Sequence, residues 1–317
     1  MTVASYAVAT REEARALLAL PEQELFARAT ALRQAHFGNG VDLCAIINAK
    51  SGNCGMDCVF CSQSRHNRTG LATFPLLPDG ELRARVERLA ASPVHHIGIV
   101  TSGGALDSAD LERLGNFVAA LPDAVRPRVC CSLGRLRREQ LEQLRDRGLV
   151  RYHHNLESAQ GYYPRVCTTQ TWEQRRDTVL AAAAAGLANC TGGLFGLGES
   201  WDERIDFAFQ LKDLGVRNIP MNFLHAHPHT PLANQPPLSA GEALAIIAVF
   251  RHILPDATLR ICGGRPETLG ERQGDIFAAG ANALMTGDYL TTSGAGLEAD
   301  LAMIAAHNMR LAGGGQS

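Results

Sequence analysis

The sequence predicts an α/β protein of the (α/β)8 TIM-type barrel class with a helical N-terminal extension. Short apolar or β-branched runs alternate with longer stretches of helical periodicity along most of the 317 residues. This alternation is typical of repeated βα units built around a parallel sheet. Chemically distinctive residues recur at or just after nearly every strand. This recurrence favours a barrel over an open doubly wound sheet, because barrel strands converge on one active site.

Eight strands are predicted, over residues 42–48, 96–101, 128–132, 151–156, 189–194, 218–224, 258–262 and 283–286. Helical patterns lie between them, over residues 79–91, 107–121, 136–147, 171–185, 201–214 and 239–254. Asp107 and Ser239 can cap exposed backbone N–H groups at helix starts. Gly148, Gly186 and Gly215 follow helix ends, where a left-handed residue is favoured. We expect residues 1–40 to form the helical extension, 41–306 the barrel and 307–317 a disordered tail.

The composition excludes several classes of function. Apolar residues make up 46% of the chain and charged residues 20%, as in an ordinary globular protein. The formal charge is −2 and no long basic block occurs, so we expect no nucleic-acid partner. No eighteen-residue apolar run or signal-peptide pattern is present, so we expect no membrane contact. Nine cysteines, an odd number, argue against a complete disulfide framework and favour a reducing, cytoplasmic location.

Cys54, Cys58 and Cys61 form a Cys-x3-Cys-x2-Cys run. Thiolates at such short spacings can converge on zinc or on an iron–sulfur cluster. Structural zinc needs a fourth ligand, and no Cys or His pair follows at zinc-finger spacing. Three ligands without a fourth predict a four-iron cluster with one open iron. A zinc knuckle or inert thiols remain the alternatives. The spacing resembles the signature of the radical S-adenosylmethionine (SAM) superfamily, in which the open iron binds SAM.

A second set of thiols lies within predicted strands three, five and seven: Cys130, Cys131, Cys190 and Cys262. Alternate strand residues face inward, so only one of Cys130 and Cys131 can face the lumen, and Cys262 shares its face with Arg260. The glycines after Cys190 indicate a closely approached backbone. Each cysteine alone could be a small core residue, but three on inward faces favour a second cluster.

Two further cysteines, Cys44 and Cys167, have no such neighbours in the sequence, and we expect them to be structural. The motif His225-Ala-His227-Pro-His229 follows the sixth predicted strand. We expect it to form a solvated or substrate-facing loop, with a metal site as the alternative.

From residue 42 to 292 the motifs resemble the biotin synthase family. They are Asn48-Ala-Lys-Ser-Gly-Asn-Cys54, Arg151-Tyr-His-His-Asn155-Leu-Glu157, Cys190-Thr-Gly-Gly-Leu-Phe-Gly-Leu-Gly-Glu199, Ile219-Pro-Met-Asn222, Thr230-Pro-Leu232, Arg260-Ile-Cys-Gly-Gly-Arg265 and Tyr289-Leu-Thr-Thr292. The resemblance implies a sulfurtransferase that cleaves SAM to a 5′-deoxyadenosyl radical. This radical abstracts hydrogen from dethiobiotin, and an auxiliary iron–sulfur cluster donates the sulfur that closes the ring of biotin.

The resemblance also implies roles for individual residues. Cys54, Cys58 and Cys61 hold the 4Fe-4S cluster. The SAM-binding residues are Phe60, Ser102, Gly103, Gly104, Asn155, Glu157, Arg175 and Leu194. The substrate-side residues are Lys50, His153, Asn155, Asn222, Arg260, Thr291 and Thr292. His153 stands where the family pattern has an asparagine.

The auxiliary site departs from the common family pattern. Where that pattern has a cysteine at the end of strand two, this chain has Thr101, while Cys262 replaces a serine that is not a ligand. Cys130 and Cys190 match the two remaining cysteines. The exchange resembles the variant type whose auxiliary cluster is a four-iron centre with an extra sulfide, and it implies Cys130, Cys190 and Cys262 as ligands, with Arg260 not bound to iron. A 2Fe-2S cluster is the alternative.

Partners follow from the same resemblance: dethiobiotin, a flavodoxin-type or ferredoxin-type electron donor, and a second copy in a homodimer. Two radical SAM relatives with this scaffold, the hydrogenase-maturation protein and methylornithine synthase, are alternatives. A non-catalytic iron–sulfur carrier is a third. A carrier has no need of Arg175, Glu157 or the glycines after strand two, so SAM binding distinguishes it.

Overall fold

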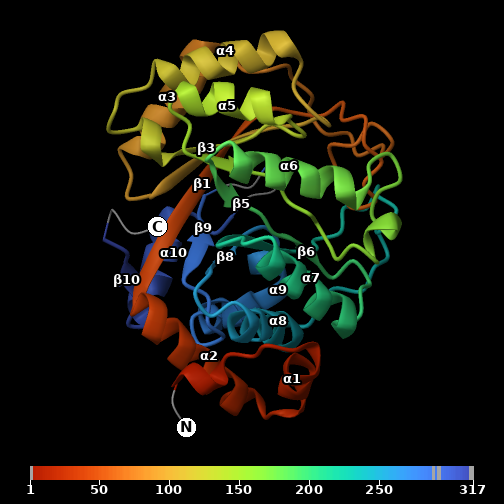
Figure 1. The fold of residues 1–317 in the computed structure, drawn as a ribbon, viewed down its shortest axis with the longest axis vertical. Coiled ribbons are helices and arrows are strands. Elements are labelled where there is room, and N and C mark those ends of the chain that lie inside the picture. Colours follow the sequence, from red (N-terminus) through yellow and green to blue (C-terminus); the bar gives the residue numbers. More distant parts are fainter. Residues whose placement is uncertain (1–2, 288–289, 291–293, 314–317) are drawn as a thin grey trace.

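Parallel strands close into a barrel in the computed structural model, which describes residues 3–287, 290 and 294–313 (Figure 1). The barrel strands are β1 (Gly40–Lys50), β2 (His96–Thr101), β3 (Val129–Ser132), β4 (Arg151–His153), β5 (Ala188–Cys190), β6 (Gly193–Phe195), β7 (Asn218–Phe223), β8 (Thr258–Ile261) and β9 (Ala283–Met285). Pairing of β1 with β9 closes the sheet. Because β5 and β6 share one position, the barrel has eight strand positions, and the predicted fold class is confirmed.

The fifth predicted strand, residues 189–194, is wrong as one continuous strand. It divides into β5 and β6, both of which pair with β7. A Cβ at Gly192 would lie 1.9 Å from the Pro220 carbonyl oxygen, so the two backbones approach as only glycine permits. The Gly192 amide donates to Asn155 Oδ1 at 3.1 Å instead of joining the ladder.

The predicted helices are present on the outside of the barrel. They are α3 (Asp79–Ala90), α4 (Ser108–Ala119), α5 (Arg138–Asp146), α6 (Trp172–Ala184), α7 (Trp201–Asp213) and α8 (Ala240–Ile253). The Asp107 and Ser239 side chains accept hydrogen bonds from backbone amides of the first helical turns, as predicted. Two further helices, α9 (Arg265–Leu269) and α10 (Leu297–Ala306), follow β8 and β9. Among the described residues, none of the helices has the length and apolar character needed to cross a membrane.

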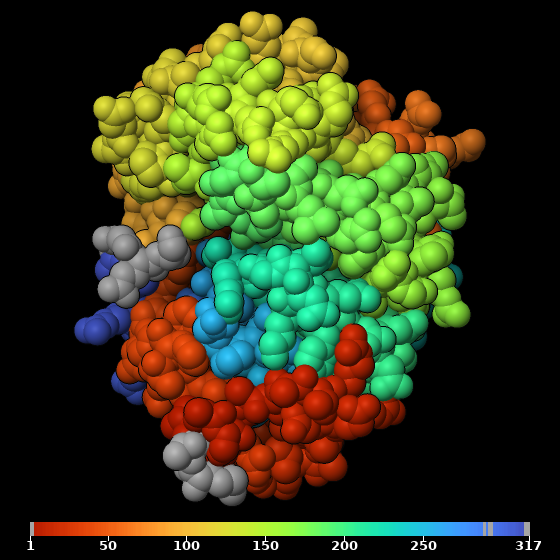
Figure 2. All heavy atoms as spheres, viewed as in Figure 1, coloured from red at the N-terminus to blue at the C-terminus, as the bar shows by residue number. Residues whose placement is uncertain are grey.

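The N-terminal segment is helical and packs on the barrel. It comprises the 3-10 turns η1 (Val3–Tyr6) and η2 (Leu17–Ala19) and the helices α1 (Arg11–Ala16) and α2 (Glu22–Phe37). Helix α2 packs against α8, and α1 against α7, at the lower end in Figure 1. Figure 2 shows this segment in red, as a continuous surface over that end of the molecule.

The predicted disordered tail begins too early. Strand β10 (Arg310–Leu311) pairs with Gly40 and Val41 at the start of β1, and Met309 is buried. This stretch is ordered because Met309 is buried in the core and because β10 pairs with the edge of β1. Residues 314–317 of the predicted tail lie outside the described residues.

Candidate active site

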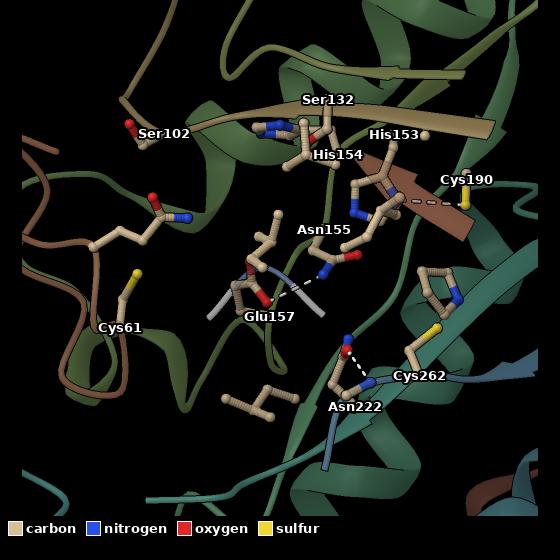
Figure 3. A pocket seen from close by; sticks show the side chains of 18 of the residues that line it. Cys61, Ser102, Ser132, His153, His154, Asn155, Glu157, Cys190, Asn222 and Cys262 are labelled. Atoms are coloured by element: carbon tan, nitrogen blue, oxygen red, sulfur yellow. Dashed lines mark hydrogen bonds between the residues drawn. The ribbon is translucent and has the colours of Figure 1, made fainter. Parts of the chain in front are cut away.

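One cavity of about 420 Å³ occupies the carboxyl end of the barrel. That volume is within the usual range for a small-molecule site. Its wall combines the inward faces of the strands with the loop that follows β1. Figure 3 shows Cys61 at one end, Cys190 and Cys262 at the other, and Asn155, Glu157 and Asn222 between them. The two predicted sets of thiols therefore share one cavity.

Cys54, Cys58 and Cys61 all line this cavity, on the loop after β1. Hydrogen bonds fix the backbone of that loop. The Asn67 side-chain amide donates to the carbonyl oxygens of Cys58 at 3.2 Å and Cys61 at 2.9 Å. The Cys54 amide donates to the Gln63 carbonyl at 3.1 Å. Burial raises the pKa of Cys61 to about 11, and the neighbouring Cys54 thiolate adds to the rise.

These three thiols fit a cluster better than a single ion. Thiolates on one zinc ion all lie about 2.3 Å from the metal and hence close to each other. No three Cys, His, Asp or Glu side chains approach closely enough to hold one metal ion in the part of the chain that the structure describes. A multi-iron cluster accepts more widely spaced thiolates, and three ligands leave one of four irons open.

The segment after β2 closes over the cysteine loop. Ser102 Oγ donates to the Gly52 carbonyl at 2.7 Å and so joins the end of β2 to the loop. Gly103 has a φ of +117°, which disfavours any other residue. A Cβ at Gly104 would meet the Met56 methyl at 3.2 Å. The predicted Ser102, Gly103 and Gly104 all line the cavity and expose backbone to it.

Asn155, Glu157 and Arg175 form a partly buried polar group in the middle of the cavity. Arg175 Nη2 lies 2.9 Å from Glu157 Oε1, and Arg175 Nε donates to the Asn155 carbonyl at 2.5 Å. Asn155 Nδ2 donates to Glu157 Oε2 at 3.4 Å. Burial raises the pKa of Glu157, and Arg175 partly offsets the rise. Glu157 has a φ of +68°, a strained backbone that is typical of functional sites.

Cys130, Cys190 and Cys262 line the opposite end of the cavity. Of the two adjacent cysteines, Cys130 lines the cavity, whereas Cys131 is fully buried and is absent from its wall. His153 Nδ1 lies 3.4 Å from Cys190 Sγ, as Figure 3 shows.

Arg260 is held by an acidic partner at this end. Arg260 Nη1 lies 2.8 Å from Asp42 Oδ1; the Arg260 side chain is buried and that of Asp42 is 13% exposed. Burial works to raise the pKa of Asp42, but Arg260 and a hydrogen bond from His96 outweigh it and hold that pKa well below its usual range. Burial works to lower the pKa of Arg260, but Asp42 outweighs it, so the pKa is raised and the guanidinium stays charged.

The expectation that Cys44 has no neighbouring thiols is wrong. Cys44 lines the cavity together with the second set of thiols. Burial raises the pKa of Cys44 to about 11, Arg260 lowers it, and Cys190 and Asp42 raise it further. The strand alternates regularly between half-buried and buried residues, and Cys44 is on the half-buried, inward face. That alternation was readable in the sequence.

Other predicted site residues divide into three groups. Phe60, His153, Leu194 and Asn222 line the cavity. Lys50 is absent from its wall and instead forms an ion pair with Asp110 at 3.3 Å. Thr291 and Thr292 lie outside the described residues. Further lining residues that the sequence did not indicate include Met56, Ser132, His154 and Gln170.

Asn222 is already engaged by the backbone. Its side-chain amide donates to the Gly193 carbonyl at 3.1 Å, and its Oδ1 accepts from the Gly263 amide at 3.0 Å. These two bonds fix the amide plane across β6 and the loop after β8. One N–H and one lone pair remain for a ligand.

Family models match both halves of the chain. The Radical SAM superfamily matches residues 49–211, and the Biotin and Thiamin Synthesis associated domain matches residues 220–310. The biotin synthase of Desulfovibrio desulfuricans is 66% identical over 299 residues, which are 94% of this chain and 95% of that protein. The chain belongs to the biotin synthase family. The biotin synthase of Nitratidesulfovibrio vulgaris is 45% identical, covering 94% of this chain and 85% of that protein. The chain therefore has biotin synthase function, as a radical SAM sulfurtransferase.

Solved structures agree on the fold. Methylornithine synthase superposes with a TM-score of 0.84 at 19% identity, over 98% of this chain and 96% of that one. HydG, a maturase of the [FeFe]-hydrogenase, gives a TM-score of 0.82 at 16% identity, over 97% and 73%. At such low identity these likenesses establish the barrel alone. Membership of the biotin synthase family assigns this chain the biotin synthase activity, in place of either of these two activities or a role as an iron–sulfur carrier.

Proposed function

We propose that this biotin synthase family member converts dethiobiotin to biotin between two iron–sulfur sites at opposite ends of one cavity. The observation that supports this arrangement is the placing of Cys54, Cys58 and Cys61 at one end and of the second set of thiols at the other. When bound, the two clusters and SAM supply a 5′-deoxyadenosyl radical at the first end and a sulfur atom at the second. The barrel wall holds the reactants in line and keeps water out.

On the SAM side, we infer that Arg175 binds the SAM carboxylate and Glu157 the ribose. The two side chains now neutralise each other, 2.9 Å apart, so SAM binding exchanges one buried ion pair for contacts of the same kind. Backbone groups at Ser102, Gly103 and Gly104 lie against the loop that carries the first three cysteines. Phe60 and Leu194 supply apolar surface for the adenine.

On the substrate side, we infer that Asn155, Asn222 and His153 contact the ureido ring of dethiobiotin. Asn222 has one donor and one acceptor left, which matches the donor and acceptor of a urea group. Thr291 and Thr292 are proposed for the carboxylate of the substrate. Lys50 is proposed for the same carboxylate after release from Asp110.

For the auxiliary site, we infer a four-iron centre held by Cys130, Cys190 and Cys262, with an extra sulfide on the remaining iron. Cys130, Cys190 and Cys262 supply the three thiolates that a four-iron cluster needs to keep one iron open. The ion pair with Asp42 gives Arg260 a structural partner and argues against Arg260 as an iron ligand.

Partners and location are also proposals. A flavodoxin or ferredoxin is the expected electron donor, and a homodimer is the expected assembly. All nine cysteines are unpaired in the structure, in keeping with a reducing cytoplasm. The proposed domain limits are residues 1–40 for the extension and 41–306 for the barrel, with residues 310–311 added to it as β10.

An anaerobic assay with SAM, a strong reductant and dethiobiotin tests this proposal. The reconstituted wild type should give biotin and 5′-deoxyadenosine by mass spectrometry. Cys262→Ser should retain 5′-deoxyadenosine formation and lose biotin, because only the auxiliary site is changed. Cys131→Ser is the matched control, since this thiol is buried outside the cavity. Full biotin formation by Cys262→Ser would refute the proposed ligand set.

A further inference from the structure

Four thiols, not three, surround the lumen at the auxiliary end: Cys44, Cys130, Cys190 and Cys262. They come from β1, β3, β5 and the residue that follows β8. These elements occupy alternate positions around the barrel. Alternate strands of an eight-stranded parallel barrel contribute their inward side chains to common layers of four.

The strand pairings fix which residues share a layer. Strands in such a barrel are tilted, so a layer climbs one residue at each step from strand to strand. Cys44 pairs with His96, so the layer passes through Ile97. Ile97 pairs with Val129, which leads to Cys130.

Each step goes to the paired residue on the next strand and then one residue further along that strand. Continued through β4 to β9, these steps return to Cys44. The inward members of the layer are Cys44, Cys130, Cys190 and Arg260. Three corners of this layer are therefore thiols. Cys262 is two residues beyond Arg260 on the same inward face, and it therefore stands two layers above the fourth corner.

At the fourth corner, Arg260 is engaged in its ion pair with Asp42. Arg260 and Asp42 neutralise each other at 2.8 Å, and Asp42 is two residues before Cys44 on the same face of β1. Arg260 is therefore level with the three thiols of this layer, and Asp42 lies below them. Cys262, above Arg260, is the fourth thiol around the lumen.

A disulfide does not account for Cys44. Leu43 and Ile261 both pair with Leu284, so Cys44 and Cys262, which follow them, are in hydrogen-bonding register with each other on either side of β9. Two strand spacings put their Cα atoms roughly 9 Å apart, beyond the reach of a disulfide. The hydrogen bonding of Cys44 Sγ to described residues is limited to a long 3.8 Å contact with the Ala45 carbonyl.

We propose that Cys44 is a fourth thiolate ligand of the auxiliary cluster, taking the iron that Cys130, Cys190 and Cys262 leave open whenever the extra sulfide is absent. The inference rests on the proposed four-iron auxiliary centre. Cysteine thiolates are the usual ligands of all four irons in such clusters. Cys44 therefore keeps the cluster closed after its sulfur has been donated, until new sulfide displaces the thiolate.

The test uses the full-length chain with Cys54, Cys58 and Cys61 changed to alanine, so that only auxiliary iron is measured. This parent is reconstituted with 57Fe and four equivalents of sulfide, without excess. Cys44→Ala is compared with Cys131→Ala in the same background, because Cys131 is a buried thiol that is absent from the cavity wall. Mössbauer spectra and the rate of conversion to a three-iron EPR signal under mild oxidation are the readouts.

We expect the parent and Cys131→Ala to resist conversion and Cys44→Ala to lose one iron at least about tenfold faster, which corresponds to about 1.4 kcal/mol in its barrier. Equal rates in parent and Cys44→Ala, with four irons in each, would overturn the role of Cys44 alone. Two irons per parent chain would overturn the four-iron centre itself, and the inference with it.

A second measurement avoids any change at Cys44. In the parent, native alkylation with N-ethylmaleimide is followed by mass spectrometry of the peptide that contains Cys44. The thiol should react in the apoprotein and in cluster-loaded protein given excess sulfide, and should be protected in protein without excess sulfide. Reaction at one rate in all three samples would contradict the proposal.

Discussion

At the scale of single residues, the site depends on charges that are buried in pairs. The Asp42–Arg260 and Glu157–Arg175 pairs line or underlie the cavity, and each side chain is less than 15% exposed. Breaking a buried pair by neutralising one partner leaves an uncompensated charge, which is far more costly than losing a surface pair. The two pairs give separate predictions, one for stability and one for SAM binding.

Asp42→Asn should destabilise the fold by about 3–5 kcal/mol, because it leaves Arg260 charged and buried. The folded-state pKa of Asp42 is depressed, so its stabilisation is fully present above the ordinary pKa of about 3.9 and is lost as the pH falls below it. Anaerobic urea unfolding should therefore show a constant difference from wild type between about pH 5 and 8 and a smaller one below about pH 4.

The control for this prediction is Asp123→Asn. Asp123 also pairs with an arginine, but its side chain is 94% exposed, so the change should cost less than about 1 kcal/mol. A loss at Asp42 as small as that at Asp123 would contradict the structural role of the pair with Arg260.

Glu157→Gln should weaken SAM binding by about tenfold, or about 1.4 kcal/mol, because the ribose hydroxyls lose a charged acceptor and keep only a neutral amide oxygen. Equilibrium dialysis with SAM measures the dissociation constant, and a thermal melt checks the fold. Unchanged SAM affinity in a folded variant would remove Glu157 from the SAM site.

At the scale of elements, the sequence predicted most strands and helices to within a few residues. Apolar runs and caps such as Asp107 are local signals, and local signals are readable. The break between β5 and β6 was not predicted, because it comes from the approach of Pro220, which is distant in sequence from Gly192. The sequence did not group Cys44 with the second set of thiols for a related reason, because those thiols are on other strands.

Gly192→Ala should disrupt this element strongly. The new methyl group would sit 1.9 Å from the Pro220 carbonyl oxygen, so backbone must move. We expect a loss of more than about 3 kcal/mol of unfolding free energy and loss of biotin formation, since Cys190 and Leu194 flank the position. Gly161→Ala is the control, because nothing lies within 4 Å of its Cβ. Wild-type stability in Gly192→Ala would refute the close approach of β6 and β7.

At the scale of the whole molecule, the barrel is shared with enzymes of different activity at 16–19% identity. What distinguishes this chain is the set of side chains on its inward faces, above all the thiols of alternate strands. Sequence motifs identified three of the four lumenal thiols and the first cysteine set. The ion pairs that occupy Arg260 and Lys50 required the fold, because each joins residues far apart in the chain.

The central claim is that sulfur passes to the substrate, within this cavity, from an auxiliary cluster that the second set of thiols holds. The most direct test is a single-turnover reaction of protein whose clusters were reconstituted with 34S sulfide, in unlabelled buffer, with the biotin analysed by mass spectrometry. We expect the wild type to give biotin that is two mass units heavier than unlabelled biotin, and Cys190→Ser to give 5′-deoxyadenosine without biotin. Unlabelled biotin from the labelled wild-type protein would contradict it.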